Sequence, residues 1–192
     1  NYSFNADESM LLIETESEGI YRWSSMSNYF VHNLITGETT PIADFKNGKQ
    51  RLATISPDKK RVAFVRNNNI FIFNIETKEE KQVTFDGEKN KIINGATDWV
   101  YEEEFGFDRG LYWNETGSLL AYYKFNESSV PEYGMDIYGS LYPERTTFKY
   151  PKAGEKNSDV SIHIYELSKN KSFLVENTSA EFEYIPRIKW GK

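Results

Sequence analysis

Three consecutive glutamates, Glu102 to Glu104, stand beside aromatic residues in the stretch 98–105. Adjacent carboxylates repel one another, so this arrangement favours a bound cation that offsets the repulsion. The α-ammonium of a peptide is such a cation, because it donates hydrogen bonds to carboxylates and is attracted by aromatic faces. The alternative is a solvated acidic turn, in which Asp98 caps a short helix and the glutamates face water.

Other chemistries find little support in the sequence. No glycine is followed two residues later by serine, so the Gly-x-Ser-x-Gly nucleophile elbow of an α/β-hydrolase is absent from these 192 residues. The histidines, His32 and His163, alternate with apolar neighbours and are predicted to be ordinary strand residues. The absence of cysteine excludes a disulfide framework and a cysteine-based metal site. We therefore expect no catalytic residue, metal or cofactor in this chain.

The composition is typical of a soluble globular chain with many strand-forming residues. Aromatic residues make up 16% of the chain, and no apolar run approaches the roughly 20 residues that span a bilayer. The net charge of −6 argues against nucleic acid or an anionic membrane as a partner, because both require basic patches. No signal peptide is visible at Asn1.

Two turn motifs alternate along the chain and indicate an internal repeat. The first is a polar turn between an apolar or aromatic residue and an apolar strand, at residues 4–7, 55–58 and 113–116, with Trp190 at the start of a fourth. The second is a hairpin turn between two later strands, at residues 34–38, 75–79 and 166–170. The strands after the first motif, residues 10–13, 62–65 and 119–123, are predicted to be the buried second strand of each unit.

Four short strands per unit are typical of a propeller blade. We predict an all-β fold, a partial β-propeller of roughly three four-stranded antiparallel blades, with a short helical insertion that carries Glu102 to Glu104. An unrelated β-sandwich is the alternative. Three insertions interrupt the repeat, and site-building loops add length in this way. They contain Tyr21 to Trp23, the stretch 98–105, and the tyrosine- and proline-rich residues 125–159.

The motif Asp-Trp-Val-Tyr-Glu-Glu-Glu at residues 98–104 resembles the substrate-amine motif in the β-propeller of the dipeptidyl peptidase IV family. The resemblance is strong from residue 92 to 154, through residues 111–113, 119–122, 125–127, 130–131 and 150–154, and weak before residue 60. It implies that Glu103 and Glu104 bind the N-terminal ammonium of a peptide substrate, whereas Glu102 faces away or supports the turn.

The resemblance also implies a role for Arg22, which would contact the substrate's backbone carbonyl and the glutamate pair. The match is loose, because residues 23–26 depart from the family pattern, and an ordinary exposed arginine is the alternative. The third insertion resembles an arm that helps to build the family's homodimer. Its aromatic residues would suit an interface, namely Tyr133, Tyr138, Tyr142 and Phe148. A surface loop that folds back on its own blade is the alternative.

We therefore interpret residues 1–192 as a fragment of a single β-propeller domain, about three of the family's eight blades. By resemblance, the parent protein is a serine-type exopeptidase that releases N-terminal dipeptides with proline or alanine second, and its catalytic triad lies in a C-terminal α/β-hydrolase domain outside these residues. The fragment alone should be inactive. Two alternatives are a related peptidase of different specificity and a non-catalytic propeller that binds proteins or glycans. Mammalian members of the family that this chain resembles carry disulfides, so the lack of cysteine, set against that resemblance, favours a bacterial periplasmic or cell-surface enzyme.

Overall fold

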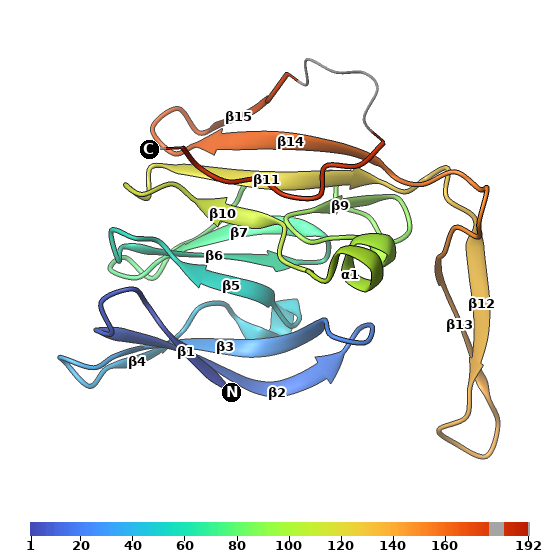
Figure 1. The fold of residues 1–192 in the computed structure, drawn as a ribbon. Coiled ribbons are helices and arrows are strands. Elements are labelled where there is room, and N and C mark those ends of the chain that lie inside the picture. Colours follow the sequence, from blue (N-terminus) through green and yellow to red (C-terminus); the bar gives the residue numbers. More distant parts are fainter. Residues whose placement is uncertain (177–182, 192) are drawn as a thin grey trace.

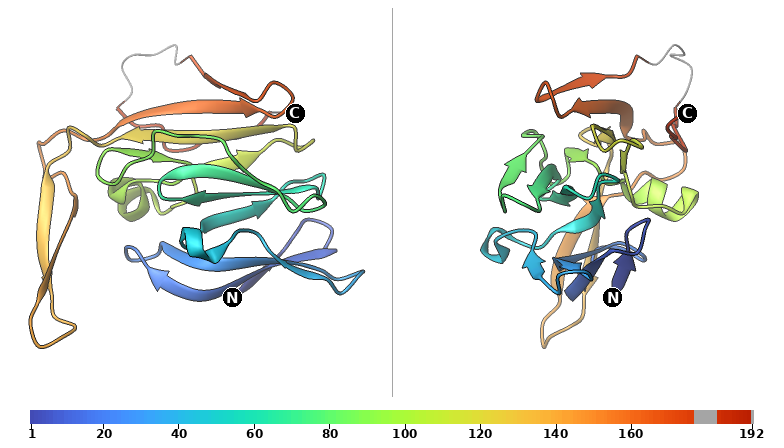
Figure 2. Two further views of the ribbon diagram at one scale, coloured as in Figure 1. Left: turned by 180° about the vertical axis from the view of Figure 1, so that it is seen from behind. Right: turned by 90° about the vertical axis from the view of Figure 1, so that its left-hand side faces the viewer.

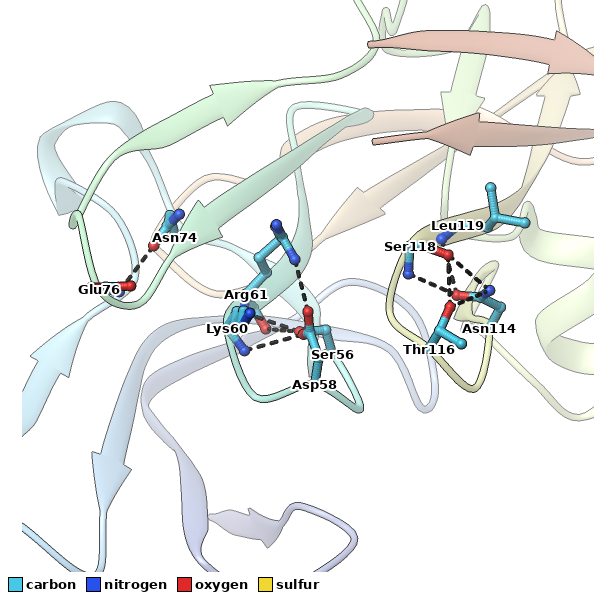
Figure 3. A network of polar contacts seen from close by, with 10 residues as sticks. All are labelled: Ser56, Asp58, Lys60, Arg61, Asn74, Glu76, Asn114, Thr116, Ser118 and Leu119. Carbon is cyan, nitrogen blue, oxygen red and sulfur yellow. Dashed lines mark hydrogen bonds and ion pairs between the residues drawn. The ribbon is translucent and has the colours of Figure 1, made fainter. Parts of the chain in front are cut away.

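Short polar turns separate the strands and are closed by their own side chains (Figure 3). In the second unit, Ser56 Oγ donates to Asp58 Oδ1 at 2.5 Å and accepts from Arg61 N at 3.0 Å. In the third unit, Asn114 Oδ1 accepts from Ser118 N at 2.9 Å. These local bonds satisfy the backbone of the turn without help from distant residues. The motifs around Ser56 and Asn114 are therefore turns, as predicted from the sequence.

The strands form three stacked antiparallel meanders in a computed structural model that describes residues 1–176 and 183–191 (Figure 1). The first contains β1 (Tyr2–Phe4), β2 (Met10–Gly19), β3 (Ser25–Asn33) and β4 (Thr39–Pro41). The second contains β5 (Arg51–Ile55), β6 (Arg61–Arg66), β7 (Asn69–Asn74) and β8 (Glu80–Gln82). The third contains β10 (Leu111–Trp113), β11 (Leu119–Asn126), β14 (Asp159–Glu166) and β15 (Lys171–Leu174), and β9 (Ile92–Asn94) pairs with β11.

Helices are few and short. A 3₁₀-helix, η1 (Phe45–Asn47), lies between the first two sheets in sequence, and α1 (Trp99–Phe105) is the one α-helix in the part of the chain that the structure describes. The prediction of an all-β chain with a short helix around the glutamates is thus confirmed. None of the described helices is long or apolar enough to cross a membrane.

Apolar side chains fill the spaces between successive sheets. One cluster joins the first and second sheets and includes Leu12, Val31 and Phe64. Another cluster joins the second and third sheets and includes Ile72 and Leu120. The strands at 62–65 and 119–123 are buried as predicted. The strand at 10–13 is buried only at Leu12, because just one face of the first sheet packs against another sheet. For that strand the prediction of burial is confirmed only in part, since the other three residues are half-buried.

The first strands of neighbouring sheets are linked by indole groups. Trp113 Nε1 donates to the carbonyl oxygen of Thr54 at 3.3 Å, which joins β10 to β5. Trp190 Nε1 donates in the same way to Tyr112 O at 3.1 Å. Each acceptor directly precedes the apolar or aromatic residue that opens a repeat. Trp190 thus makes towards the third unit the contact that Trp113 makes towards the second.

A two-stranded hairpin projects from the stacked sheets (Figures 1 and 2). Its strands, β12 (Glu132–Ile137) and β13 (Glu144–Lys149), pair with each other and leave the third sheet between β11 and β14. We call residues 130–150 the arm. The views from the front and from behind agree that the arm leaves the end of the third sheet and runs beside the ends of the other two sheets, rather than folding back over its own sheet.

The close approach of two turns generates a prediction about Gly117. This glycine has a φ of 69°, and a Cβ there would lie 3.0 Å from Asp58 Cγ in the neighbouring unit. Gly37 has a similar φ of 76° but no neighbouring atom within 4 Å of the same position. Both Gly→Ala changes carry backbone strain, yet only Gly117→Ala adds a collision. We expect Gly117→Ala to lower the free energy of unfolding by about 1–3 kcal/mol more than Gly37→Ala.

Denaturant unfolding of the two variants beside the wild type measures this difference. Equal losses of stability for Gly117→Ala and Gly37→Ala would contradict tight contact between the two turns.

Candidate functional site

Helix α1 presents the glutamate run at the end of the sheets from which the arm projects (Figures 1 and 2). Asp98 caps its first turn, since Asp98 Oδ1 accepts from Tyr101 N at 3.0 Å. Gly106 ends the helix in the left-handed conformation with a φ of 72°. Burial raises the pKa of Asp98, whereas hydrogen bonds from Ser158 Oγ and Tyr101 N oppose that rise.

Tyr101 holds the helix against the third sheet. Its ring centroid lies 4.8 Å from that of Phe125 and 4.9 Å from that of Phe105. Its hydroxyl oxygen accepts from Ile185 N at 2.8 Å. Burial raises the pKa of this hydroxyl to about 12, so Tyr101 stays neutral at ordinary pH. These contacts therefore fix the orientation of the helix against the third sheet.

Glu102 is almost completely buried, at 1% exposure. Its Oε1 atom accepts from Trp23 N at 2.8 Å and from Ser24 N at 2.9 Å. The first of the three glutamates thus binds the loop of the first insertion. The alternative of a turn whose glutamates all face water is wrong for Glu102, although Asp98 does cap the helix as that alternative expected.

Glu103 forms an ion pair with Arg22 at the surface of the same loop. Arg22 Nε lies 3.1 Å from Glu103 Oε1, and the side chain of Glu103 is 17% exposed while that of Arg22 is 67% exposed. Glu104 is exposed, and no described residue forms a hydrogen bond with its side chain. The structure therefore brings Glu103 and Arg22 together, from positions 81 residues apart in the chain.

The loop that carries Arg22, residues 20–24, is tightly closed, and we call it the Arg22 loop. Ile20 N donates to Ser24 O at 2.8 Å, and Tyr21 N donates to Ser24 Oγ at 3.3 Å. Ser24 is 2% exposed and so is enclosed between the loop and helix α1. Trp23 is exposed at the tip. Ser24 lies among the residues that depart from the family pattern, and its structural role had no signal in the sequence.

Aromatic contacts connect this site to the base of the arm. The ring of Phe148 lies 5.8 Å from that of Tyr21, and the ring of Tyr150 lies 4.3 Å from that of Trp99. Tyr133 also packs at this base, with its ring 6.0 Å from that of Phe148. The arm is thus attached both to the Arg22 loop and to helix α1.

The four aromatic residues predicted for the arm divide into two groups. Tyr133 and Phe148 pack at the base, as described above. Tyr138 and Tyr142 are 80% and 77% exposed in the hairpin's far connection, together with Leu141. Of these four residues, only Tyr138 and Tyr142 expose most of their side-chain surface, where another molecule could contact them.

Two charged residues near the site were missed at the level of sequence. Arg51 has buried Nε and Nη2 atoms without a hydrogen-bond partner in the described chain. Burial lowers the pKa of its guanidinium, and the negative charges of Asp108 and Glu102 oppose this shift. Arg51, Tyr21 and Glu127 line a pocket of about 410 Å³ beside the base of the arm. An arginine that opens a strand gives no sequence signal of this burial.

Glu127 is the second missed residue, although it lies in the motif 125–127. It is 5% exposed, and burial raises its pKa to about 7, helped by the negative charge of Asp98 and opposed by the ammonium of Lys149. The histidines make ordinary contacts within strands: His32 Nδ1 lies 2.8 Å from Thr39 Oγ1, and His163 stacks on Tyr122. Within residues 1–176 and 183–191, no cluster of three or more acidic, histidine or cysteine residues could hold a metal ion.

Comparison with known proteins identifies what this chain is similar to. Residues 5–192 match the family model described as the dipeptidyl peptidase IV (DPP IV) N-terminal region. The chain is 34% identical over 186 residues to dipeptidyl peptidase 4 of Trichophyton tonsurans, covering 93% of this chain and 24% of that protein. It is 34% identical over 168 residues to prolyl endopeptidase FAP of Homo sapiens, covering 86% of this chain and 22% of that protein.

A solved structure agrees with these matches. The crystal structure of Porphyromonas gingivalis dipeptidyl peptidase 4 superimposes with a TM-score of 0.90 and 43% identity, over 97% of this chain and 27% of that chain. This chain thus spans about a quarter of the length of the relatives it matches.

The raised pKa of Glu127 predicts a pH dependence of stability. Between its ordinary value of 4.5 and about 7, the folded protein keeps this proton while the unfolded chain loses it. Stability from this group is therefore present at low pH and is lost as the pH rises through that window. Glu127→Gln removes the titrating group. The free energy of unfolding of the variant, relative to that of the wild type, should therefore be about 1–3 kcal/mol greater at pH 8 than at pH 5.

Denaturant unfolding at both pH values tests the prediction, with Glu115→Gln, at an exposed glutamate, as the control. A Glu127→Gln variant whose stability follows the wild type in parallel from pH 5 to pH 8 would refute it.

Proposed function

This chain belongs to the dipeptidyl peptidase IV family, and we propose that it is the substrate-recognition part of a serine exopeptidase that releases N-terminal dipeptides. In this proposal, Glu103 and Glu104 bind the substrate's α-ammonium. Arg22 contacts the substrate's backbone carbonyl and the glutamate pair. The second residue of the preferred substrate is proline or alanine, as the family resemblance implies.

The observation that carries the proposal is the ion pair between Arg22 and Glu103 at 3.1 Å. Arg22 compensates one of the two carboxylates, which leaves one negative charge for a ligand cation. Glu103 is partly accessible and Glu104 is exposed, so a ligand can reach both from solvent. When an ammonium binds, two carboxylates face two cations and the local charge is balanced, which favours charge-assisted hydrogen bonds.

The aromatic residues next to the glutamates also support this assignment. Trp99 lies beside Tyr150 in the base of the arm, at a ring separation of 4.3 Å. Aromatic faces near an ammonium add cation–π attraction and exclude water, which strengthens each ionic hydrogen bond. A solvated acidic turn would not need such neighbours.

Catalysis belongs to another part of the parent protein in this proposal. The relatives are about four times as long as this chain, and residues 1–192 contain no nucleophile elbow. Fixing the ammonium in the propeller at a constant distance from a serine in an α/β-hydrolase domain would determine that two residues are released at each cleavage. Binding energy at a remote group would then orient the scissile bond.

The arm is the proposed contact with a second copy of the protein. Its exposed Tyr138 and Tyr142, with Leu141, offer the aromatic and apolar surface that is enriched in interfaces. Tyr133 and Phe148 would act indirectly, by fixing the base of the arm against the Arg22 loop.

The glutamate pair yields a test in the full-length enzyme. Glu103→Gln and Glu104→Gln keep size and remove one charge, and a hydrogen bond to a charged group contributes about 1.5–3 kcal/mol. Each variant should therefore lose about ten- to a hundredfold in kcat/KM for a Gly-Pro chromogenic substrate. The double variant should lose less than the product of the two, because both carboxylates serve one cation.

Glu115→Gln, which removes an exposed carboxylate from a distant turn, is the matched control. An N-acetylated substrate should be poor for the wild type, and the glutamine variants should discriminate against it less. If both single variants cleave free-amine substrates as fast as the wild type, the glutamates do not bind the ammonium.

The arm yields a second test. Tyr138→Ser with Tyr142→Ser alters only the exposed end and keeps the contacts of Phe148 and Tyr133 at the base. The double variant should shift the full-length enzyme from dimer towards monomer in sedimentation velocity, since interface aromatic residues often contribute more than about 1 kcal/mol each. An unchanged dimer would show that the end of the arm is not part of the interface.

A further inference from the structure

Glu102 has no role in the proposed binding of the ammonium, yet it is the most buried of the three glutamates. Its contacts join two segments that are 78 and 79 residues apart in sequence. We propose that Glu102 is a positioning residue, which fixes the Arg22 loop on helix α1 and thereby sets where the Arg22 guanidinium meets Glu103. This inference rests on the proposed function and deepens it.

The argument starts from the two backbone N–H groups. Trp23 N and Ser24 N both donate to one oxygen of Glu102, at 2.8 and 2.9 Å. Ser24 is buried, so its N–H group has no ready replacement for this acceptor in water. An unpaired buried donor is costly, and bonds to an ionised acceptor are short and directional. The loop therefore has one strongly preferred position against the helix.

That position is transmitted to Arg22 by the peptide bond. The Arg22–Trp23 peptide group is planar, so holding Trp23 N also fixes the direction in which the backbone of Arg22 leaves it. On the helix, Glu102 directly precedes Glu103. Three consecutive residues of the loop thus contact two consecutive residues of the helix: Trp23 and Ser24 contact Glu102, and Arg22 forms the ion pair with Glu103 at 3.1 Å.

Further contacts hold the other side of Arg22. Tyr21 packs against Phe148 in the arm, and Ile20 N closes the loop on Ser24 O at 2.8 Å. Arg22 itself is 67% exposed and makes its charged contact at the surface. Because the backbone is fixed on both sides of Arg22, this residue has little backbone freedom to lose when substrate binds. Such preorganisation favours binding.

Two conservative variants separate an acceptor role from a charge role. Glu102→Gln keeps an amide oxygen at the same reach, able to accept both N–H bonds, but removes the charge. Glu102→Asp keeps the charge but withdraws the oxygen by about one carbon–carbon bond, or about 1.5 Å. A positioning residue needs the oxygen in place, so Gln should be tolerated and Asp should not. In contrast, the proposed function predicts that Glu103→Gln lowers activity, because the charge of Glu103 binds the ammonium.

The kinetic test uses the full-length enzyme and a Gly-Pro chromogenic substrate. Glu102→Asp should lose about tenfold or more in kcat/KM, mainly through KM, because a misplaced binding group is costly even at small displacement. Glu102→Gln should stay within about threefold of the wild type in kcat/KM, since it weakens the two N–H bonds but leaves their acceptor in place, so that its cost falls on stability and not on the position of Arg22. Asp44→Ala, which removes an exposed carboxylate that also accepts a backbone N–H, is the matched control and should be silent.

A second readout does not depend on activity. In the resting enzyme, hydrogen exchange of the peptide that contains Trp23 and Ser24 should be slow in the wild type and in Glu102→Gln, and faster in Glu102→Asp. In a double-mutant cycle, Glu102→Asp should add little to Arg22→Ala, because Glu102 acts through Arg22. A purely structural role would give additive losses.

The outcomes distinguish this inference from the proposed function. If Arg22→Ala and Glu103→Gln leave KM unchanged, the proposed function fails and this inference fails with it. If those two variants raise KM but Glu102→Gln is as damaging as Glu102→Asp, or exchange at Trp23 and Ser24 is unaltered in Glu102→Asp, only the positioning role of Glu102 is overturned.

Discussion

Burial of Tyr101 is the interaction on which the acidic site depends. A helix of seven residues such as α1 is not stable by itself in water. The cap formed by Asp98 contributes about 1 kcal/mol, which is too little to order three adjacent carboxylates against their repulsion. The ring of Tyr101, packed among Phe105, Phe107 and Phe125, supplies the apolar contact that holds the helix on the third sheet. The hydrophobic core thus determines where the charges stand.

The three glutamates have different environments because the helix meets a loop from another sheet. Residue 102 faces that loop and is buried, residue 103 lies at its edge, and residue 104 faces solvent. Burying one carboxylate costs less at this position than in an apolar site, since two backbone N–H groups and the nearby charge of Arg51 stabilise it. One run of identical residues therefore supplies an internal anchor, a surface charge paired with Arg22 and an exposed charge.

Local chemistry made the repeat predictable from sequence. The turns at Ser56 and Asn114 are closed by bonds that span no more than five residues, so their motifs report the structure directly. The Asp98 cap is equally local. The burial of Glu102 could not be predicted, because its partners lie 78 and 79 residues away and any of the three glutamates could have faced them. For the same reason, aromatic composition identified the arm but did not separate Phe148 at its base from Tyr142 at its exposed end.

The indole contacts between units give the assembly of these sheets a direction. In both contacts the donor lies later in the chain than its acceptor: Trp113 bonds to Thr54, and Trp190 bonds to Tyr112. During synthesis from the N-terminus, each acceptor strand has already left the ribosome when its tryptophan appears. The third unit can therefore dock on the second, and the segment with Trp190 on the third, without waiting for sequence still to come. The order of translation and the order of contacts coincide, which shortens the time for which each apolar sheet face stays uncovered.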